Sequence, residues 1–283
     1  MMTTKKVTDK KPKQEIKRVR DKKERKQLRS VICWAIAAIL WTVASVIAAQ
    51  FIVGYLMIFM IGREAFSDTV PTVIFSALSY ILAFLMIVLL PPLVARFFEK
   101  HPIHAKQKKT KTRFVSLHTL GIDKWVTWTD IGLSVGGLVI YFILAAILFS
   151  IFNIFPWFNA EQAQSLSFST NIYGFERVLA FIILVVAAPI TEELIFRGYL
   201  YGKMREKFSQ ITSELTAVIV SALLVSITFG IIHLQWNVGV NVFALSMVAC
   251  ALREYTGTIH AGILLHMIKN GLAFYLLFVL GIS

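Results

Sequence analysis

The sequence predicts an all-α protein, a polytopic membrane helix bundle of about seven transmembrane helices. Of its 283 residues, 57% are hydrophobic and only 16% are charged, whereas soluble domains are about 45–50% apolar and about 25% charged. Long uncharged segments recur, and several reach the roughly 20 residues that a membrane helix needs. No segment shows the strict alternation of apolar and polar residues that is typical of a strand.

The predicted helices follow one another along the chain in two membrane regions. The first three occupy the uncharged windows 31–62, 69–95 and 131–160, each long enough to cross a bilayer core. A fourth helix begins after Arg177, and three more are predicted in 215–235, 237–252 and 258–281. We therefore predict a basic tail at 1–30, an N-terminal three-helix membrane region at 31–160 with the basic loop 96–124, and a second membrane region at 175–283.

The net charge of +13 is concentrated outside these helices. Residues 1–30 hold 13 Lys and Arg against 4 Asp and Glu, and the loop 96–124 holds 8 against 2. Because basic residues stay on the cytoplasmic side, we expect the N-terminus and this loop to be cytoplasmic, and seven crossings then leave the C-terminus outside. The tail has no aromatic residue for stacking and no nucleic-acid-binding fold follows it, so we expect contact with anionic lipid and not with nucleic acid. The sparse cysteines, short outer loops and Lys-rich tail favour a bacterial plasma membrane.

The fourth predicted helix contains Glu192, Glu193 and Arg197 in otherwise apolar and aromatic sequence. Ionisable groups at bilayer depth cost about 2.5–3.5 kcal/mol each on insertion scales, which makes them candidates for function. Glu193 and Arg197 are four residues apart, so they share a helix face and can pair, whereas Glu192 points about 100° away. A helix that ended early would instead place both glutamates among the lipid headgroups, but the apolar residues that follow argue against this.

Two later predicted helices each contain a pair of residues spaced four positions apart, and each pair includes a histidine. Phe229 precedes His233, and His266 precedes Asn270, so each pair occupies one helix face. An imidazole and a carboxamide on one face can supply two hydrogen-bond donors to a shared point. A lone histidine on an apolar helix is more often structural, so neither pair alone specifies a function.

Depth along the helices offers a check on whether these residues can meet. Glu192 lies about 17 Å from the charged end of its helix and His266 about 18 Å from the corresponding end, so the two depths agree. His233 lies about 28 Å along its helix, which is about 10 Å too far. The sequence leaves three roles open for Lys269: pairing with an acid, contact with water in a cavity, or extension to the membrane surface.

Taken in order, these motifs resemble the CPBP family, the CAAX-protease and bacteriocin-processing membrane proteins also called the Abi family. The shared pattern is Glu-Glu-x-x-x-Arg, Phe-x-x-x-His and His-x-x-x-Asn on successive helices, here Glu192, Glu193, Arg197, Phe229, His233, His266 and Asn270. The resemblance covers about 175–275 and implies that 175–283 is the catalytic core of an intramembrane glutamate endopeptidase. The roles that it implies are activation of the hydrolytic water by Glu192 and His233, support of the site by Glu193 with Arg197, and an oxyanion hole formed by His266 with Asn270.

The residue chemistry agrees with this assignment. A general base acts best when its pKa is close to the operating pH, and a neighbouring cation works against that. Glu192, which has no partner in its own helix, therefore suits the role of base better than Glu193. Two preorganised donors in an oxyanion hole are worth about 10²–10³ in rate each.

Alternatives remain at this point. We expect no cofactor, although two histidines and two carboxylates could bind zinc, because the sequence has no His-Glu-x-x-His motif and the family resemblance favours a metal-free site. The expected substrate is a membrane protein or a lipidated or hydrophobic peptide of CAAX, pheromone or bacteriocin-related type. The main alternative is a non-catalytic membrane scaffold or bacteriocin-immunity protein that acts through a partner. A transporter is less well supported, because the chain has no inverted repeat.

Overall fold

The computed structural model describes residues 11–100, 115–162 and 171–281. Within these residues the chain is helical and contains no strand. In this described part of the chain, seven helical spans are long and apolar enough to cross a membrane, which confirms the predicted all-α bundle. These spans are Lys22–Ile61, Thr69–Phe97, Trp128–Phe152, Gly174–Phe208, Glu214–Ile231, Trp236–Thr256 and His260–Val279.

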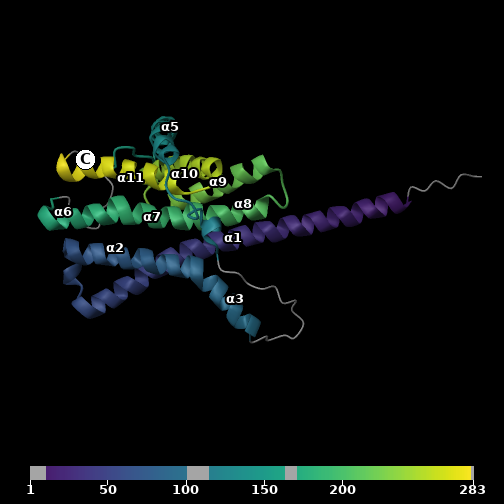
Figure 1. Cartoon of the computed structure of the whole chain (residues 1–283), viewed down its shortest axis with the longest axis horizontal. Coiled ribbons are helices and arrows are strands. Elements are labelled where there is room, and N and C mark those ends of the chain that lie inside the picture. Colours follow the sequence, from purple (N-terminus) through teal and green to yellow (C-terminus); the bar gives the residue numbers. More distant parts are fainter. Residues whose placement is uncertain (1–10, 101–114, 163–170, 282–283) are drawn as a thin grey trace, which may run out of the picture.

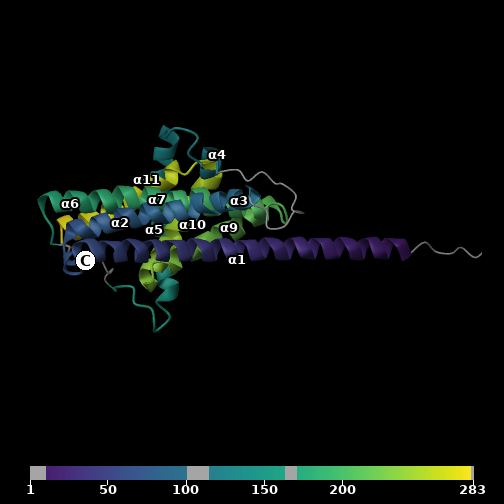
Figure 2. The same cartoon turned by 90° about the horizontal axis from the view of Figure 1, so that it is seen from below.

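The first helix, α1 (Lys11–Ile61), is much longer than one membrane crossing requires. Its 51 residues rise about 75 Å at 1.5 Å per residue, whereas the hydrocarbon core of a bilayer is about 30 Å thick. Figures 1 and 2 show α1 as a rod that extends well beyond the other helices. The described part of the predicted basic tail therefore continues the first helix, and residues 1–10 lie outside the described part of the chain.

The second span is bent. α2 (Thr69–Phe84) packs against α1 and is joined to α3 (Leu90–Lys100) by a π-helical segment at Leu85–Leu89. Pro91 and Pro92 follow this segment, and proline has no N–H to continue the α-helical hydrogen bonds. Helices kink at prolines and at π-helical turns, and Figure 1 shows α3 leaning away from the line of α2.

The predicted cytoplasmic loop 96–124 is described only at its two ends, because residues 101–114 lie outside the described chain. After that gap the chain forms α4 (Leu117–Leu120), which packs against the fourth span. α5 (Trp128–Phe152) then begins at a capping box, in which Thr127 and Asp130 each accept a hydrogen bond from the other's backbone N–H. A 25-residue helix with this start is long enough to cross a membrane.

The later helices form the core against which α5 packs. α5 contacts α10 (Trp236–Thr256) and α11 (His260–Phe274), while α9 (Glu214–Ile231) lies along α10. Gly230 and Gly239 let the backbones of α9 and α10 touch, because a Cβ at Gly230 would lie 2.9 Å from the Gly239 carbonyl oxygen. A side chain at either glycine would therefore push the two helices apart.

The fourth span alternates between α-helical and π-helical winding. α6 (Gly174–Phe181), α7 (Ala188–Glu193) and α8 (Gly202–Phe208) are separated by π-helical segments at Ile182–Ala187 and Leu194–Tyr201. Pro189 lies in the first turn of α7, where its missing N–H cannot continue the preceding helix. π-helical turns often occur at functional sites, and here two of them flank the short helix that ends in Glu192 and Glu193.

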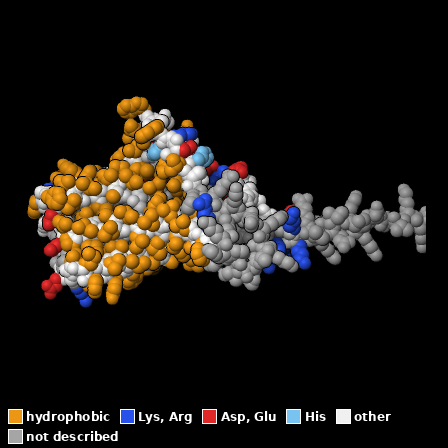
Figure 3. All heavy atoms as spheres, turned by 60° about the horizontal axis from the view of Figure 1, so that its bottom comes forward, with side chains coloured by type: hydrophobic (Ala, Val, Ile, Leu, Met, Phe, Trp, Pro, Cys, Tyr) orange, Lys and Arg blue, Asp and Glu red, His pale blue; other side chains and the backbone are white. Residues whose placement is uncertain are grey.

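The outer surface of the bundle is mostly apolar. Figure 3 shows a broad hydrophobic face with charged side chains gathered toward its two ends. On α1 alone, Phe51, Tyr55 and Phe59 are 75%, 74% and 81% exposed. Such a continuous apolar surface is unfavourable in water and suited to contact with lipid.

Candidate active site

Side chains from four parts of the fold meet around the end of α7. α7 contacts both α2 and α11, and the turn between α9 and α10 brings His233 to the same place. The site therefore combines helices from the predicted catalytic core with α2 from the N-terminal membrane region.

Glu193 and Arg197 form a fully buried ion pair. The Glu193 Oε1 atom lies 2.9 Å from Arg197 Nη1, and both side chains are completely inaccessible to solvent. This confirms the pairing predicted from their spacing along the helix. The Arg197 guanidinium carbon also lies 4.6 Å from the centre of the Phe229 ring, close enough for a cation–π interaction. A buried charge is costly unless it is paired, so these contacts stabilise both ions in the core.

His266 connects the two glutamates. Its Nδ1 atom lies 3.1 Å from Glu193 Oε1, and its Nε2 atom lies 3.8 Å from Glu192 Oε2. Because a carboxylate only accepts hydrogen bonds, the shorter contact places a proton on Nδ1. The Nε2 edge of the same ring then faces Glu192.

Gly262 makes room for the Glu193 carboxylate, a role that the sequence did not indicate. A Cβ atom at Gly262 would lie 3.2 Å from Glu193 Oε2 and 3.5 Å from the Cβ of Ala249. Glu193 is held by Arg197 and His266 and cannot retreat easily. A residue larger than glycine at this point of α11 would therefore press directly on the buried ion pair.

Glu192 has different surroundings from Glu193. Its side chain is 15% exposed, and its Oε1 atom accepts a hydrogen bond of 2.9 Å from the Tyr80 hydroxyl. Tyr80 lies on α2, far from the motif residues in the sequence, and the sequence analysis did not single it out. The signal that could have indicated it is weak: Ser79 and Tyr80 form a polar pair in the middle of an apolar span.

His233 lies on a turn and not on a helix. The predicted helix 215–235 is wrong at its end, because α9 stops at Ile231 and Leu234 adopts a left-handed conformation with φ of 58°. The chain therefore turns back before it has risen the full distance that an unbroken helix would give. Ending the helix two residues before His233 removes about 3 Å of rise, which is only part of the excess depth of about 10 Å that helical geometry assigned to His233.

The His233 ring is oriented by the end of α9. Its Nδ1 atom lies 2.7 Å from the Phe229 carbonyl oxygen, and its ring meets the Phe229 ring edge-on with centres 4.9 Å apart. A proton on Nδ1 satisfies this contact and leaves Nε2 able to accept another. Burial lowers the pKa of His233, and the negative charge of Glu192 acts in the opposite direction.

Lys269 interacts electrostatically with both Glu192 and His233. Of the three roles that the sequence left open, proximity to an acid is the one that these interactions favour.

His266 and Asn270 do not converge on one point. The Asn270 Nδ2 group donates a hydrogen bond of 2.9 Å to the carbonyl oxygen of Leu184 in the first π-helical segment of the fourth span. His266 instead contacts the two glutamates. The two residues lie on one helix face as predicted, while the oxyanion hole that the resemblance assigns to them stays a prediction.

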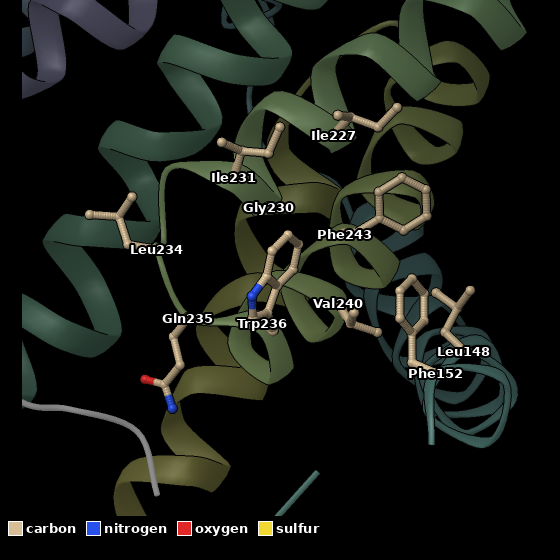
Figure 4. Close-up of a pocket in the computed structure, with 11 residues that line it drawn as sticks. Leu148, Phe152, Ile227, Gly230, Ile231, Leu234, Gln235, Trp236, Val240 and Phe243 are labelled. Carbon is tan, nitrogen blue, oxygen red and sulfur yellow. The ribbon is translucent and has the colours of Figure 1, made fainter. Parts of the chain in front are cut away.

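An apolar hollow of about 540 Å³ begins one residue after His233 (Figure 4). It lies between α5, α9 and α10, and Gln235 supplies its main polar side chain. The other lining residues are Leu148, Phe152, Ile227, Gly230, Ile231, Leu234, Trp236, Gly239, Val240 and Phe243. The hollow therefore suits an apolar chain and not a charged one.

Among the described residues, no group of three or more His, Cys, Asp or Glu side chains is arranged to hold a metal ion. The four candidate ligands at the site, two glutamates and two histidines, are already engaged with one another or with their own neighbours. The independence of the reaction from zinc stays a prediction.

Residues 174–272 match the family model described as type II CAAX prenyl endopeptidase Rce1-like. The match includes every motif residue from Glu192 to Asn270 and confirms the resemblance to the CPBP family. It supports an intramembrane endopeptidase in general, and with the seven apolar helices it indicates an integral membrane protein. No curated protein and no solved structure matches the chain.

Proposed function

We propose that this chain is an intramembrane endopeptidase in which Glu192 and His233 activate a water molecule for attack on a peptide bond. The observation that carries the proposal is the unequal environment of the two adjacent glutamates. Glu193 is fully buried and neutralised by Arg197, while Glu192 keeps 15% exposure and accepts a hydrogen bond from a neutral hydroxyl. Glu192, which is not neutralised by Arg197 and is partly exposed, can therefore take a proton from water.

The proposed reaction begins with Glu192 accepting a proton from the water. The resulting hydroxide attacks the carbonyl carbon, and the proton then passes from Glu192 to the amine as the C–N bond breaks. The Nε2 atom of His233 accepts a hydrogen bond from the same water and fixes its direction. General acid–base catalysis of this kind contributes about 10²–10⁴ in rate.

The remaining motif residues stabilise this arrangement in the proposal. Glu193 and Arg197 hold His266 in place through its Nδ1 atom. When it carries a proton on Nε2 as well as on Nδ1, His266 then donates from Nε2 to the oxyanion that develops on the substrate. Asn270 assists it after exchanging its bond to the Leu184 carbonyl for one to the substrate.

The substrate that we propose is a membrane protein or a lipidated or hydrophobic peptide. The apolar hollow supports this class, because its lining is mostly aliphatic and aromatic and includes Leu234 and Gln235, the two residues that follow His233 in the chain. The description of the matching family model names a prenyl endopeptidase, and a prenylated peptide is one member of the proposed class.

The experiment is a comparison of membrane peptides between cells that carry the wild type and cells that carry Glu192→Gln. Glu206→Gln is the matched control, because Glu206 is an exposed glutamate on α8. We expect Glu192→Gln to accumulate in the membrane like the wild type while losing cleavage by at least about 10²-fold. Unchanged cleavage in this variant would overturn the proposal.

The same variants separate a protease from a scaffold or immunity protein. A protease loses its cellular phenotype with Glu192→Gln and with His233→Ala. Full retention of the phenotype in both variants, at normal protein levels, would favour binding without catalysis.

A further inference from the structure

A second hollow lies at the C-terminal end of the fourth span, between α1 and α8. The two helices contact each other here, and the Gln27 side chain donates a hydrogen bond of 3.3 Å to the carbonyl oxygen of Gln210. The hollow measures about 460 Å³, and we name it the α1–α8 cleft. Its lining residues are Lys23, Lys26, Gln27, Ser30, Val31, Trp34, Lys207 and Gln210.

The α1–α8 cleft is strongly positive. Three of its lining residues are lysines, two from α1 and one from α8, and no Asp or Glu lines it among the described side chains. On α8, Glu206 pairs with Lys203 at 3.3 Å. On α1, Glu24 lies on an adjoining hollow together with Arg25. The cleft therefore gathers three cations around donors such as the Gln27 amide.

The cleft lies where the charged part of α1 meets its uncharged part, which is the expected level of the membrane surface. Val31 begins the uncharged part of α1 and is buried, while the lysines of the cleft stand one to two turns before it. Trp34 lies beneath them, and the Lys207 ammonium sits 5.9 Å from the centre of its ring. Tryptophan favours the level of the lipid headgroups. The cleft thus has a cationic outer part and an apolar floor on the membrane side.

We propose that the α1–α8 cleft binds a phosphate group, carried by the headgroup of an anionic phospholipid or free in solution. Lys23, Lys26 and Lys207 would contact the phosphate oxygens, since lysine is a common phosphate-binding residue. The Gln27 amide and the Ser30 hydroxyl can donate to the remaining oxygens of a headgroup. Val31 and Trp34 would lie against the upper part of an acyl chain. This proposal does not depend on the proposed protease activity.

The test uses the full chain in a neutral detergent. Native mass spectrometry counts the phosphatidylglycerol and phosphatidylcholine molecules that the protein retains. The cleft variant combines Lys23→Gln, Lys26→Gln and Lys207→Gln. The control variant removes the same charge from the same two helices outside the cleft, by Lys22→Gln, Arg29→Gln and Lys203→Gln. The single change Lys207→Gln provides a milder second variant.

We expect the wild type to retain phosphatidylglycerol in preference to phosphatidylcholine. The affinity should fall by at least about tenfold in the cleft variant and by no more than about twofold in the control, because each lysine near the phosphate contributes separately. Lys207→Gln should give an intermediate loss and keep the wild-type unfolding midpoint. Equal losses in the cleft and control variants would overturn the proposal, since they would indicate diffuse attraction without a site.

Competition with an excess of inorganic phosphate distinguishes the two sources of the group. Continued retention of phosphatidylglycerol identifies the lipid headgroup as the ligand. Displacement of the lipid, with binding of inorganic phosphate to the wild type and not to the cleft variant, identifies a site for free phosphate. The site would be refuted if the wild type retained phosphatidylglycerol no better than phosphatidylcholine and also bound no inorganic phosphate.

Discussion

Replacing Gly262 by alanine is expected to disturb the buried Glu193 carboxylate through a single added methyl group. That group would lie 3.2 Å from Glu193 Oε2 and 3.5 Å from Ala249 Cβ. Glu193 is held on its other side by Arg197 at 2.9 Å and by His266 at 3.1 Å. The strain therefore cannot be relieved by a simple rotation of the carboxylate.

Gly271 provides a matched control on the same helix. A Cβ there would lie 3.5 Å from the Cγ1 atom of Val185, which is an ordinary contact. In a helix interior, alanine is more favourable than glycine by about 0.8–1.0 kcal/mol, so Gly271→Ala should be neutral or stabilising. Gly262→Ala gains no more than this from helix propensity and loses about 1–3 kcal/mol to overpacking. The two variants should therefore differ by about 1–3 kcal/mol in the free energy of unfolding.

The free energies are measured by reversible unfolding in mixed micelles, and cleavage is measured with a membrane-anchored reporter peptide. A shift of about 1 Å in catalytic groups costs about 10² in rate. A contact of 3.2 Å requires Glu193 to move by a few tenths of an ångström, so Gly262→Ala should cleave about 3–5-fold more slowly than Gly271→Ala. Equal stability and equal cleavage in the two variants would refute the argument that Gly262 is required for the position of Glu193.

Three further predictions concern the same site. Arg197→Met leaves the Glu193 carboxylate buried without its partner and should lower the free energy of unfolding by about 3–5 kcal/mol. Lys203→Met breaks the exposed pair with Glu206 and should lower it by less than about 1 kcal/mol. Similar losses in the two variants would contradict the argument that burial makes the Glu193–Arg197 pair important. Tyr80→Phe removes a hydrogen bond to a carboxylate worth about 1.5–3 kcal/mol and should lower kcat about 10–100-fold with KM unchanged, so an unchanged kcat would exclude a positioning role. Metal chelators should leave cleavage unchanged because a carboxylate activates the water, and recovery of chelator-treated protein by zinc would show that the mechanism uses a metal.

The sequence predicted those parts of the fold and site that depend on local spacing. The seven spans follow from the length of the uncharged windows, because a bilayer sets the number of residues that a helix needs. The Glu193–Arg197 pair follows from a spacing of four residues, which survives the change to π-helical winding after Glu193. Both features lie within a single helix, where geometry is fixed by the backbone.

Contacts between distant helices could not be predicted in the same way. The His266–Glu193 bond joins residues 73 positions apart, and the Tyr80–Glu192 bond joins residues 112 positions apart. Each depends on how the helices pack, which hydrophobic periodicity does not specify. The predicted end of the helix at 235 was wrong for a related reason, because the apolar run gave no sign that α9 would stop at Ile231.

The two glutamates differ in where their partners come from, and this difference has a consequence for how the site can be altered. Arg197, His266 and Gly262, which surround Glu193, all lie in the segment 174–272 that matches the family model. Tyr80, which holds Glu192, lies on α2 outside that segment. The supporting carboxylate is therefore fixed within the motif-bearing core, while the proposed base is oriented by a helix that the core does not contain. A substitution on α2 can change the reactivity of Glu192 without disturbing the buried ion pair beneath it.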